Sequence, residues 1–271
     1  MRTLDFLARL HETLAPPTYL EIGVRYGDSL VYSRAPSIAI DPVFKLKHPV
    51  PERAVLFEET SDAYFGRERP LEPFGGRPAS LALIDGMHLS EYSLRDFINV
   101  ERHADWTSVV VFDDILPRTV EEASRERATR SWTGDVFKIM DLLSENRPDL
   151  IQLRVATRPT GLLLVLGLDP ESEVLGERIN ELVDQAAAPD PQSVPFARIE
   201  REGVLDPESV LTAAFWGELR HARDRGVRRA DGLDALREAA AADVARAKRV
   251  RYPPRSMRNS LRRLRRTARL G

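Results

Sequence analysis

Short apolar runs, alternating with helical patterns, dominate the first 170 residues of the chain. Seven of these runs have the length and the β-branched content of strands. They span residues 18–24, 37–41, 54–59, 79–85, 108–114, 150–157 and 161–168. The first five are apolar without alternation, which favours strands buried on both faces, as in a parallel sheet. Only Arg-Pro-Thr separates the last two runs, so we expect those to form an antiparallel hairpin.

Amphipathic patterns predict the helices. Residues 93–103 and 136–146 are expected to form helices between strands, and residues 1–14 an N-terminal helix rather than a signal peptide. After Asp169 the strand signals stop, and three helical patterns follow within residues 171–188, 206–226 and 232–251, the second opened by the start signal Asp206-Pro207. The pattern therefore predicts an α/β domain over 1–169, a helical appendage over 170–245 and a basic tail over 246–271.

Composition narrows the class of protein. The 271 residues include no cysteine, which excludes a disulfide framework and any thiolate metal site or nucleophile. No run reaches the ~18–20 apolar residues of a membrane span. We expect a cytoplasmic protein.

Charge is distributed unevenly along the chain. Eleven of the 40 Lys and Arg lie between Arg246 and Gly271, whereas all 42 Asp and Glu lie before Arg246. An acidic body thus carries a basic tail. The tail could be solvated, dock on the acidic body of a second copy in a homo-oligomer, or bind an anionic membrane surface from the cytoplasmic side. A nucleic acid is the less favoured partner, because the body is acidic and shows no interleaved aromatic and basic residues.

Acidic residues stand where the strands end. In an open α/β sheet, ligands bind beyond the carboxyl ends of the strands. Asp41 ends the second strand, Asp85 the fourth, and Asp113 and Asp114 the fifth. Carboxylates gathered at one edge repel each other unless a cation joins them, and Mg²⁺ or Ca²⁺ prefers carboxylate oxygen. The alternative is that one of the pair faces solvent or caps a helix.

The first strand ends in a glycine-containing loop. Glu21, Gly23 and Gly27 form an E-x-G-x-x-x-G arrangement, which differs from the dinucleotide fingerprint. Glycine allows the backbone to turn sharply and to approach a ligand closely.

Together, the segments YLEIGVRYGDSL, AIDP, LALIDGMHLSEYSLRDF, VVVFDD and WTGDVFK resemble class I S-adenosylmethionine-dependent methyltransferases, and among them the Methyltransf_24 family. The resemblance covers about residues 18–168. It implies a Rossmann-like, doubly wound sheet of seven strands in the order 3-2-1-4-5-7-6, with strand seven antiparallel, and it makes residues 1–169 the methyltransferase domain.

The resemblance also implies a cofactor site for S-adenosylmethionine. Glu21, Gly23 and Gly27 would frame the methionine part of the cofactor. Asp41 would hold the ribose, and Ser61 would lie near the adenine. Asp85 would line the same site.

Metal-dependent O-methyltransferases of this type hold Mg²⁺ with an aspartate after strand four and an acidic pair after strand five. Asp85, Asp113 and Asp114 match those places. The known bases of the group are absent, since Met87 and His88 occupy their positions. We expect His88, with Asp85, to be catalytic, because the unperturbed pKa of histidine suits a general base.

A polar segment over residues 117–130 is the expected lid of the site. Trp132, which follows this segment in the sequence, is a candidate to contact the methyl acceptor. Thr133 is expected to cap the helix that begins near Val136. The predicted function is O-methylation of a sugar, glycan or small-metabolite hydroxyl. A non-catalytic partner protein with the methyltransferase fold, or an RNA methyltransferase using the basic tail, are the alternatives.

Overall fold

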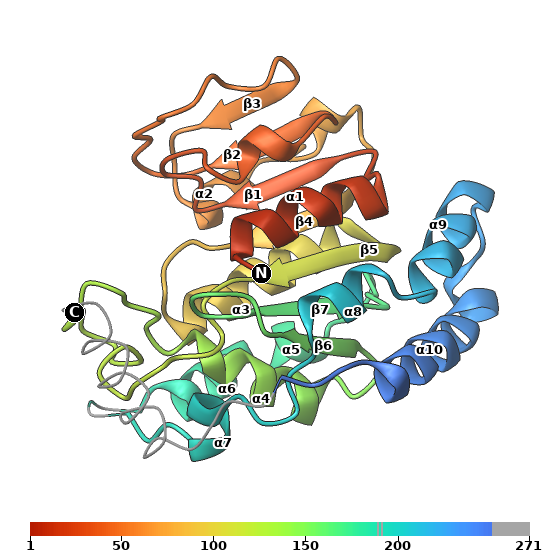
Figure 1. Cartoon of the computed structure of the whole chain (residues 1–271). Coiled ribbons are helices and arrows are strands. Elements are labelled where there is room, and N and C mark those ends of the chain that lie inside the picture. Colours follow the sequence, from red (N-terminus) through yellow and green to blue (C-terminus); the bar gives the residue numbers. More distant parts are fainter. Residues whose placement is uncertain (189, 191, 251–271) are drawn as a thin grey trace, which may run out of the picture.

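One mixed sheet of seven strands forms the centre of the computed structural model, which describes residues 1–188, 190 and 192–250 (Figure 1). The strand order is β3-β2-β1-β4-β5-β7-β6. The strands are β1 (Tyr19–Ile22), β2 (Ser37–Ile40), β3 (Ala54–Phe57), β4 (Ala79–Ile84), β5 (Ala104–Phe112), β6 (Ile151–Val155) and β7 (Leu162–Leu166).

Strand direction follows the sequence pattern. The first five strands pair in parallel, whereas β7 runs antiparallel to both β5 and β6. All residues of β1, β2, β4 and β7 are buried, as their continuous apolar runs predict. The predicted strand order and the antiparallel seventh strand are therefore confirmed.

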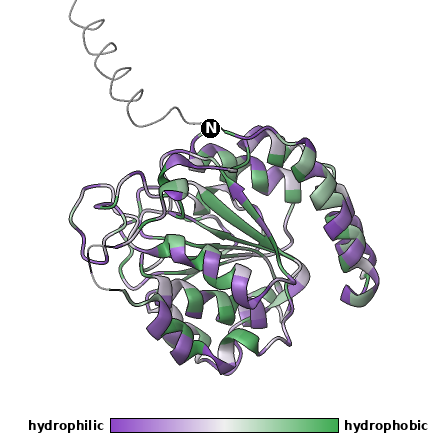
Figure 2. Cartoon of the chain, turned by 90° about the horizontal axis from the view of Figure 1, so that it is seen from below, coloured by the Kyte–Doolittle hydropathy of each residue, from purple (hydrophilic) through white to green (hydrophobic). Residues whose placement is uncertain are grey.

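Helices cover both faces of the sheet (Figure 2). The α-helices are α1 (Thr3–Leu14), α2 (Ser61–Phe65), α3 (Ser90–Arg102), α4 (Ile139–Asn146), α5 (Val174–Glu177), α6 (Ile179–Ala186), α7 (Phe196–Glu200), α8 (Pro207–Leu211), α9 (Phe215–Arg225) and α10 (Arg229–Arg246), and the short 3₁₀ helices are η1 (Leu30–Tyr32), η2 (Glu72–Phe74) and η3 (Val136–Lys138). One apolar core lies under α3, α4 and α6, and a second lies under α1, α8, α9 and α10. Each face of the sheet is thus removed from water. This burial of apolar surface is the main favourable contribution to folding.

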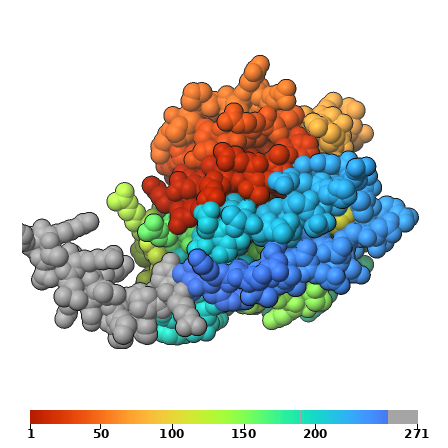
Figure 3. Space-filling model, turned by 45° about the vertical axis from the view of Figure 1, so that its right-hand side comes forward, coloured from red at the N-terminus to blue at the C-terminus, as the bar shows by residue number. Residues whose placement is uncertain are grey.

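The helices after residue 170 share these cores. Trp216 of α9 and Leu233 of α10 belong to the same apolar cluster as Trp106 and Leu166 of the sheet. The indole N–H of Trp106 also donates to the carbonyl of Val227, at 2.8 Å. On the surface, α1, α8, α9 and α10 lie next to one another (Figure 3). The predicted appendage therefore helps to cover both sheet faces, with α5 and α6 on one and α8, α9 and α10 on the other.

The edge of β6 is also covered. Leu205 exchanges backbone hydrogen bonds with Arg154 and Ala156, and Val250 donates to the carbonyl of Val204 at 3.0 Å. These contacts satisfy backbone groups that an open edge strand would leave to another chain.

Several predicted helices are shorter or broken. Residues 171–188 form α5 and α6 rather than one helix, and residues 206–226 form α8 and α9. Asp206 accepts a hydrogen bond from the backbone of Ser209 and so caps α8, as its start signal predicts. The break before α9 depends on a distant residue, because the carboxylate of Asp243 accepts from the backbone N–H of Phe215 at 2.9 Å.

The basic tail falls mostly outside the described residues, which end at Val250, so the membrane, RNA and second-copy interpretations of it stay predictions. Among the described residues, no helix combines the length and the apolar character needed to cross a membrane.

Candidate functional site

The loop after β1 is held in place by two glycines with positive φ angles. Gly23 has φ +89°, and a Cβ there would lie 2.0 Å from the carbonyl oxygen of Asp85. The loop after β1 thus touches the backbone after β4, which no other residue would allow without a shift. Gly27 has φ +74°, and its N–H donates to the carbonyl of Val24.

Glu21 is buried under this loop, with 1% of its surface exposed. Its carboxylate accepts hydrogen bonds from the hydroxyls of Tyr19 and Ser29. Burial raises the pKa of Glu21 to about 7, although the two hydrogen bonds lower it; the charges of Asp85 and Asp41 add to the rise. A cationic ammonium group bound beside Glu21 would favour its ionised form.

Asp41, directly after β2, is tied to the protein backbone. One carboxylate oxygen accepts from the N–H of Arg25 at 2.8 Å, and the other from the N–H of Val43 at 2.7 Å. Only 8% of Asp41 is exposed. Each oxygen can accept a second hydrogen bond, so the predicted ribose contact remains chemically open.

The loops after β1 and β2 also pair with each other. Lys45 donates from its backbone to Arg25, and Lys47 does so to Tyr26, over whose ring its ammonium lies at 3.6 Å. The segment after β2 therefore lies against the glycine-containing loop. Access of a ligand to that loop depends on the position of this segment.

Ser61, the predicted adenine neighbour, is the first residue of α2. Its side chain bonds to the buried carboxylate of Asp96 on α3. Burial raises the pKa of Asp96 to about 7, although the Ser61 hydrogen bond lowers it. Sequence reasoning missed Asp96, because an acidic residue inside an amphipathic helix normally indicates a solvated face.

Asp85, His88 and Asp114 come together at the carboxyl ends of β4 and β5. His88 Nε2 lies 3.5 Å from Asp85 Oδ1, and His88 Nδ1 lies 3.1 Å from Asp114 Oδ2. One potential ligand atom from each side chain lies within 4.8 Å of the others. Two of the three predicted metal ligands, Asp85 and Asp114, thus meet at one edge of the sheet, with His88 between them.

Asp113 lies outside that three-residue group. Its carboxylate accepts from the N–H of Asp114 at 2.7 Å, and Asp114 has φ +62°, which a non-glycine residue seldom adopts. Burial and then the charge of Asp114 raise the pKa of Asp113 well above its usual range. The positive φ of Asp114 therefore separates the two neighbouring side chains, and of this pair only Asp114 belongs to the group with Asp85 and His88.

The charge of His88 follows from its neighbours. Burial lowers its pKa, but hydrogen bonding to Asp85 and the charges of Asp85 and Asp114 outweigh burial and raise the pKa to about 9. At neutral pH the ring between these carboxylates is a cation. His88 can act as the predicted base only after it loses this proton, which requires that the charge of the carboxylates be neutralised first. Its catalytic role stays a prediction.

Trp132 closes one side of this group. Its ring stacks on that of His88 at 5.2 Å between centroids, and its carbonyl lies 2.9 Å from His88 Nδ1. Its indole N–H donates to the carbonyl of Ser124 at 2.6 Å. Trp132 is thus held against His88.

An ion-pair network fastens the predicted lid. Arg125 pairs with Glu91 of α3 and with the fully buried Asp135, which also pairs with Lys138 and accepts from the N–H of Ser90. Sequence reasoning missed this network, since the charges of residues 117–130 are typical of a solvated loop. These pairs join the lid to the start of α3, next to His88.

The expected cap by Thr133 is wrong. Its hydroxyl donates to the carbonyls of Glu122 and Gly134, because the chain between Glu122 and Thr133 folds back on itself. Gly134 is the residue that fixes the turn: it has φ +53°, and a Cβ there would lie 1.6 Å from the carbonyl oxygen of His88.

Comparison with known proteins gives structural likeness only. No model of a protein family matches the sequence, and no curated protein matches it. Among solved structures, an O-methyltransferase from Bacillus cereus in complex with SAH is 14% identical, with a TM-score of 0.43, covering 60% of this chain and 80% of that one. An SAH-bound methyltransferase from Podospora anserina is 15% identical, with a TM-score of 0.47 and coverage of 61% and 78%.

A third similar structure is the MycE methyltransferase from the mycinamycin biosynthetic pathway, in complex with Mg, SAH and mycinamycin VI. It is 15% identical, with a TM-score of 0.45, and the match covers 63% of this chain and 50% of that one. At these identities the likeness reaches no further than the fold.

Proposed function

We propose that this protein is an S-adenosylmethionine-dependent O-methyltransferase. One observation carries the proposal: the sheet order 3-2-1-4-5-7-6 brings Glu21, Asp41, Asp85 and Asp114 to the carboxyl ends of adjacent strands, where ligands bind in open α/β sheets. A row of acidic groups suits a cofactor with a sulfonium, an ammonium and two ribose hydroxyls.

The reaction is an in-line displacement at the methyl group. The acceptor oxygen forms a bond to the methyl carbon, the bond from carbon to sulfur breaks, and the sulfur keeps the electron pair. The hydroxyl proton of the acceptor must go to a base. Asp85 is the most exposed member of the Asp85, His88 and Asp114 group, at 35% for its side chain, so an acceptor hydroxyl reaches it most easily. Orientation of the two reactants can contribute about 7–11 kcal/mol to lowering the barrier.

A divalent cation fits the same group of side chains. Two carboxylates and one imidazole each offer a ligand atom that lies within 4.8 Å of the others. A hydrogen bond from His88 Nδ1 to the carbonyl of Trp132 would fix the tautomer that leaves Nε2 free as a ligand. Such a cation would stabilise the alkoxide that develops on the acceptor. Because a nitrogen ligand favours transition-metal ions over Mg²⁺, we expect tighter binding of Mn²⁺ than of the predicted Mg²⁺.

The acceptor is proposed as a sugar, a glycan or a small metabolite with a free hydroxyl. The test is mass spectrometry after incubation of the full chain with a cell extract and S-adenosylmethionine carrying a labelled methyl group. We expect label in a small molecule, and a drop of about 100-fold or more in Asp85→Asn. Undiminished labelling in both Asp85→Asn and Asp114→Asn would refute the proposed site.

Metal binding is measured separately by calorimetry with Mn²⁺ and Mg²⁺. A heat of binding that disappears in Asp114→Asn would support the proposed metal site. No heat of binding with either ion would refute the metal site, but it would not affect the proposal of methyl transfer.

A non-catalytic partner protein is the second candidate. It is favoured by His88, because hydrogen bonding to Asp85 and the charges of Asp85 and Asp114 outweigh burial and raise its pKa to about 9, so that the expected base is protonated at neutral pH. Failure of the chain to bind S-adenosylmethionine would support this alternative.

A further inference from the structure

A hollow lies at the edge of the sheet opposite to the group of Asp85, His88 and Asp114. It has a volume of about 540 Å³, within the range of small-molecule sites. Its lining includes Pro17, Pro36, Arg53 and Arg77, which lie one or two residues before β1, β2, β3 and β4. These residues mark the amino ends of the parallel strands, so at least one strand length, about 13 Å, separates the hollow from the carboxylates.

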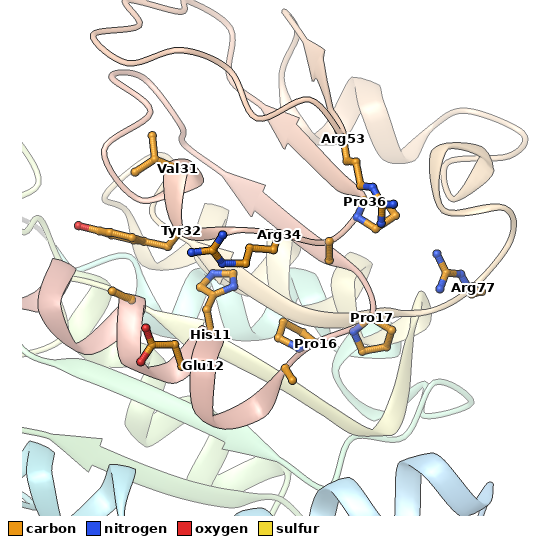
Figure 4. A pocket seen from close by; sticks show the side chains of 13 residues that line it. His11, Glu12, Pro16, Pro17, Val31, Tyr32, Arg34, Pro36, Arg53 and Arg77 are labelled. Carbon is orange, nitrogen blue, oxygen red and sulfur yellow. The ribbon is translucent and has the colours of Figure 1, made fainter.

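Three arginines from different loops surround this hollow (Figure 4). Arg34 comes from the loop before β2, Arg53 from the loop before β3 and Arg77 from the loop before β4. Arg77 donates from Nε to the carbonyl of Phe74. Within the part of the chain that the structure describes, the side chains of Arg34 and Arg53 have no hydrogen-bond or ion-pair partner. Their guanidinium groups are therefore available to a ligand.

Little negative charge from the rest of the lining lies near the arginines. His11 is buried, and burial lowers its pKa to about 4, so its ring is neutral. Glu12 is the one acidic residue among those that line the hollow. The negative end of α1 also lies here, but Arg220 and Arg223 donate to its last carbonyls, those of Thr13 and Leu14.

Apolar side chains supply the remaining walls. Tyr32 and the prolines at positions 16, 17 and 36 offer flat, rigid surfaces. A ligand with an apolar ring can pack on these surfaces while its anionic group contacts the guanidinium groups.

We propose that this hollow binds a small molecule with a phosphate group and a flat apolar part. Guanidinium groups match phosphate oxygens with paired hydrogen bonds. A long polyanion is disfavoured at this hollow, since the residues before Arg246 hold 42 acidic groups against 29 basic ones and repel it.

The test is calorimetric titration of the full chain with phenyl phosphate, inorganic phosphate and phenol, at constant ionic strength. We expect binding of one phenyl phosphate per chain, tighter than binding of inorganic phosphate or phenol. Each of Arg34→Gln and Arg53→Gln should weaken it about tenfold, the size expected for one charge-assisted contact. The exposed position of both arginines leaves folding unaffected.

The matched control changes two arginines in the tail. Arg262→Gln with Arg263→Gln alters net charge as much as Arg34→Gln with Arg53→Gln does, but it leaves the hollow intact. The proposal requires that only the Arg34 and Arg53 double variant lose binding. Equal loss in both double variants, no loss in either, or no binding at 10 mM phenyl phosphate would overturn it, and equal affinity for inorganic phosphate would overturn the apolar part.

Discussion

Gly23→Ala is expected to separate the loop after β1 from the end of β4. Two costs add up. Alanine at φ +89° costs about 1–2 kcal/mol in backbone strain. The new Cβ would also lie 2.0 Å from the carbonyl oxygen of Asp85 and 2.6 Å from the N atom of Gly86, both of which are backbone atoms. Relieving this overlap should cost about 1–3 kcal/mol more.

The matched control is Gly76→Ala. Gly76 has φ +79°, close to that of Gly23, but no atom lies within 4 Å of the position of its Cβ. Only the strain applies there. The difference in the free energy of unfolding between the two variants is therefore about 1–3 kcal/mol.

Urea unfolding followed by circular dichroism measures this difference. With an m-value of about 3 kcal/mol per M, the midpoint of Gly23→Ala should lie about 0.3–1 M below that of Gly76→Ala. Equal midpoints would show that the loop after β1 does not press on the backbone of Asp85, and the argument for close contact at this edge would fail.

Three further changes test other parts of the structure. For Glu21, the folded-state pKa of about 7 lies above the unfolded value of 4.5, so this group should reduce the stability of the wild type as pH rises from 4.5 through 7. In urea titrations at pH 5 and 8, Glu21→Gln should remove about 3 kcal/mol of this loss. An equal change in the free energy of unfolding with pH in both proteins would contradict the burial effect. Trp216→Ala should cost about 3–5 kcal/mol in the same assay, because the ring is 1% exposed in the core beneath the sheet; a cost below 1 kcal/mol would separate α9 from that core. Gly134→Ala should push the lid away from His88 and speed tryptic cleavage within residues 117–130, and an unchanged cleavage rate would argue against the contact.

The sheet could be predicted because its signals are local. Buried residues such as Ile38, Ala39 and Ile40 of β2 leave a continuous apolar run, and the acidic residue that follows marks the strand end. The meeting of Asp85 and Asp114 also follows from sequence, since neighbouring parallel strands end at one edge.

The rest depends on tertiary contacts that leave no local signal. The break between α8 and α9 is stabilised by Asp243, which lies 28 residues from Phe215. Asp113 and Asp114 look equivalent in sequence, and only the positive φ of Asp114 decides which carboxylate joins His88. Likewise, Arg125 reads as part of a solvated segment, although it pairs with the fully buried Asp135.

Calorimetric titration of the full chain with S-adenosylmethionine, in wild type and in Asp41→Ala, tests the central claim most directly. The account predicts one cofactor molecule per chain with micromolar affinity, weakened at least tenfold in the variant by loss of the ribose contact. Absence of binding in the wild type at millimolar cofactor would contradict it.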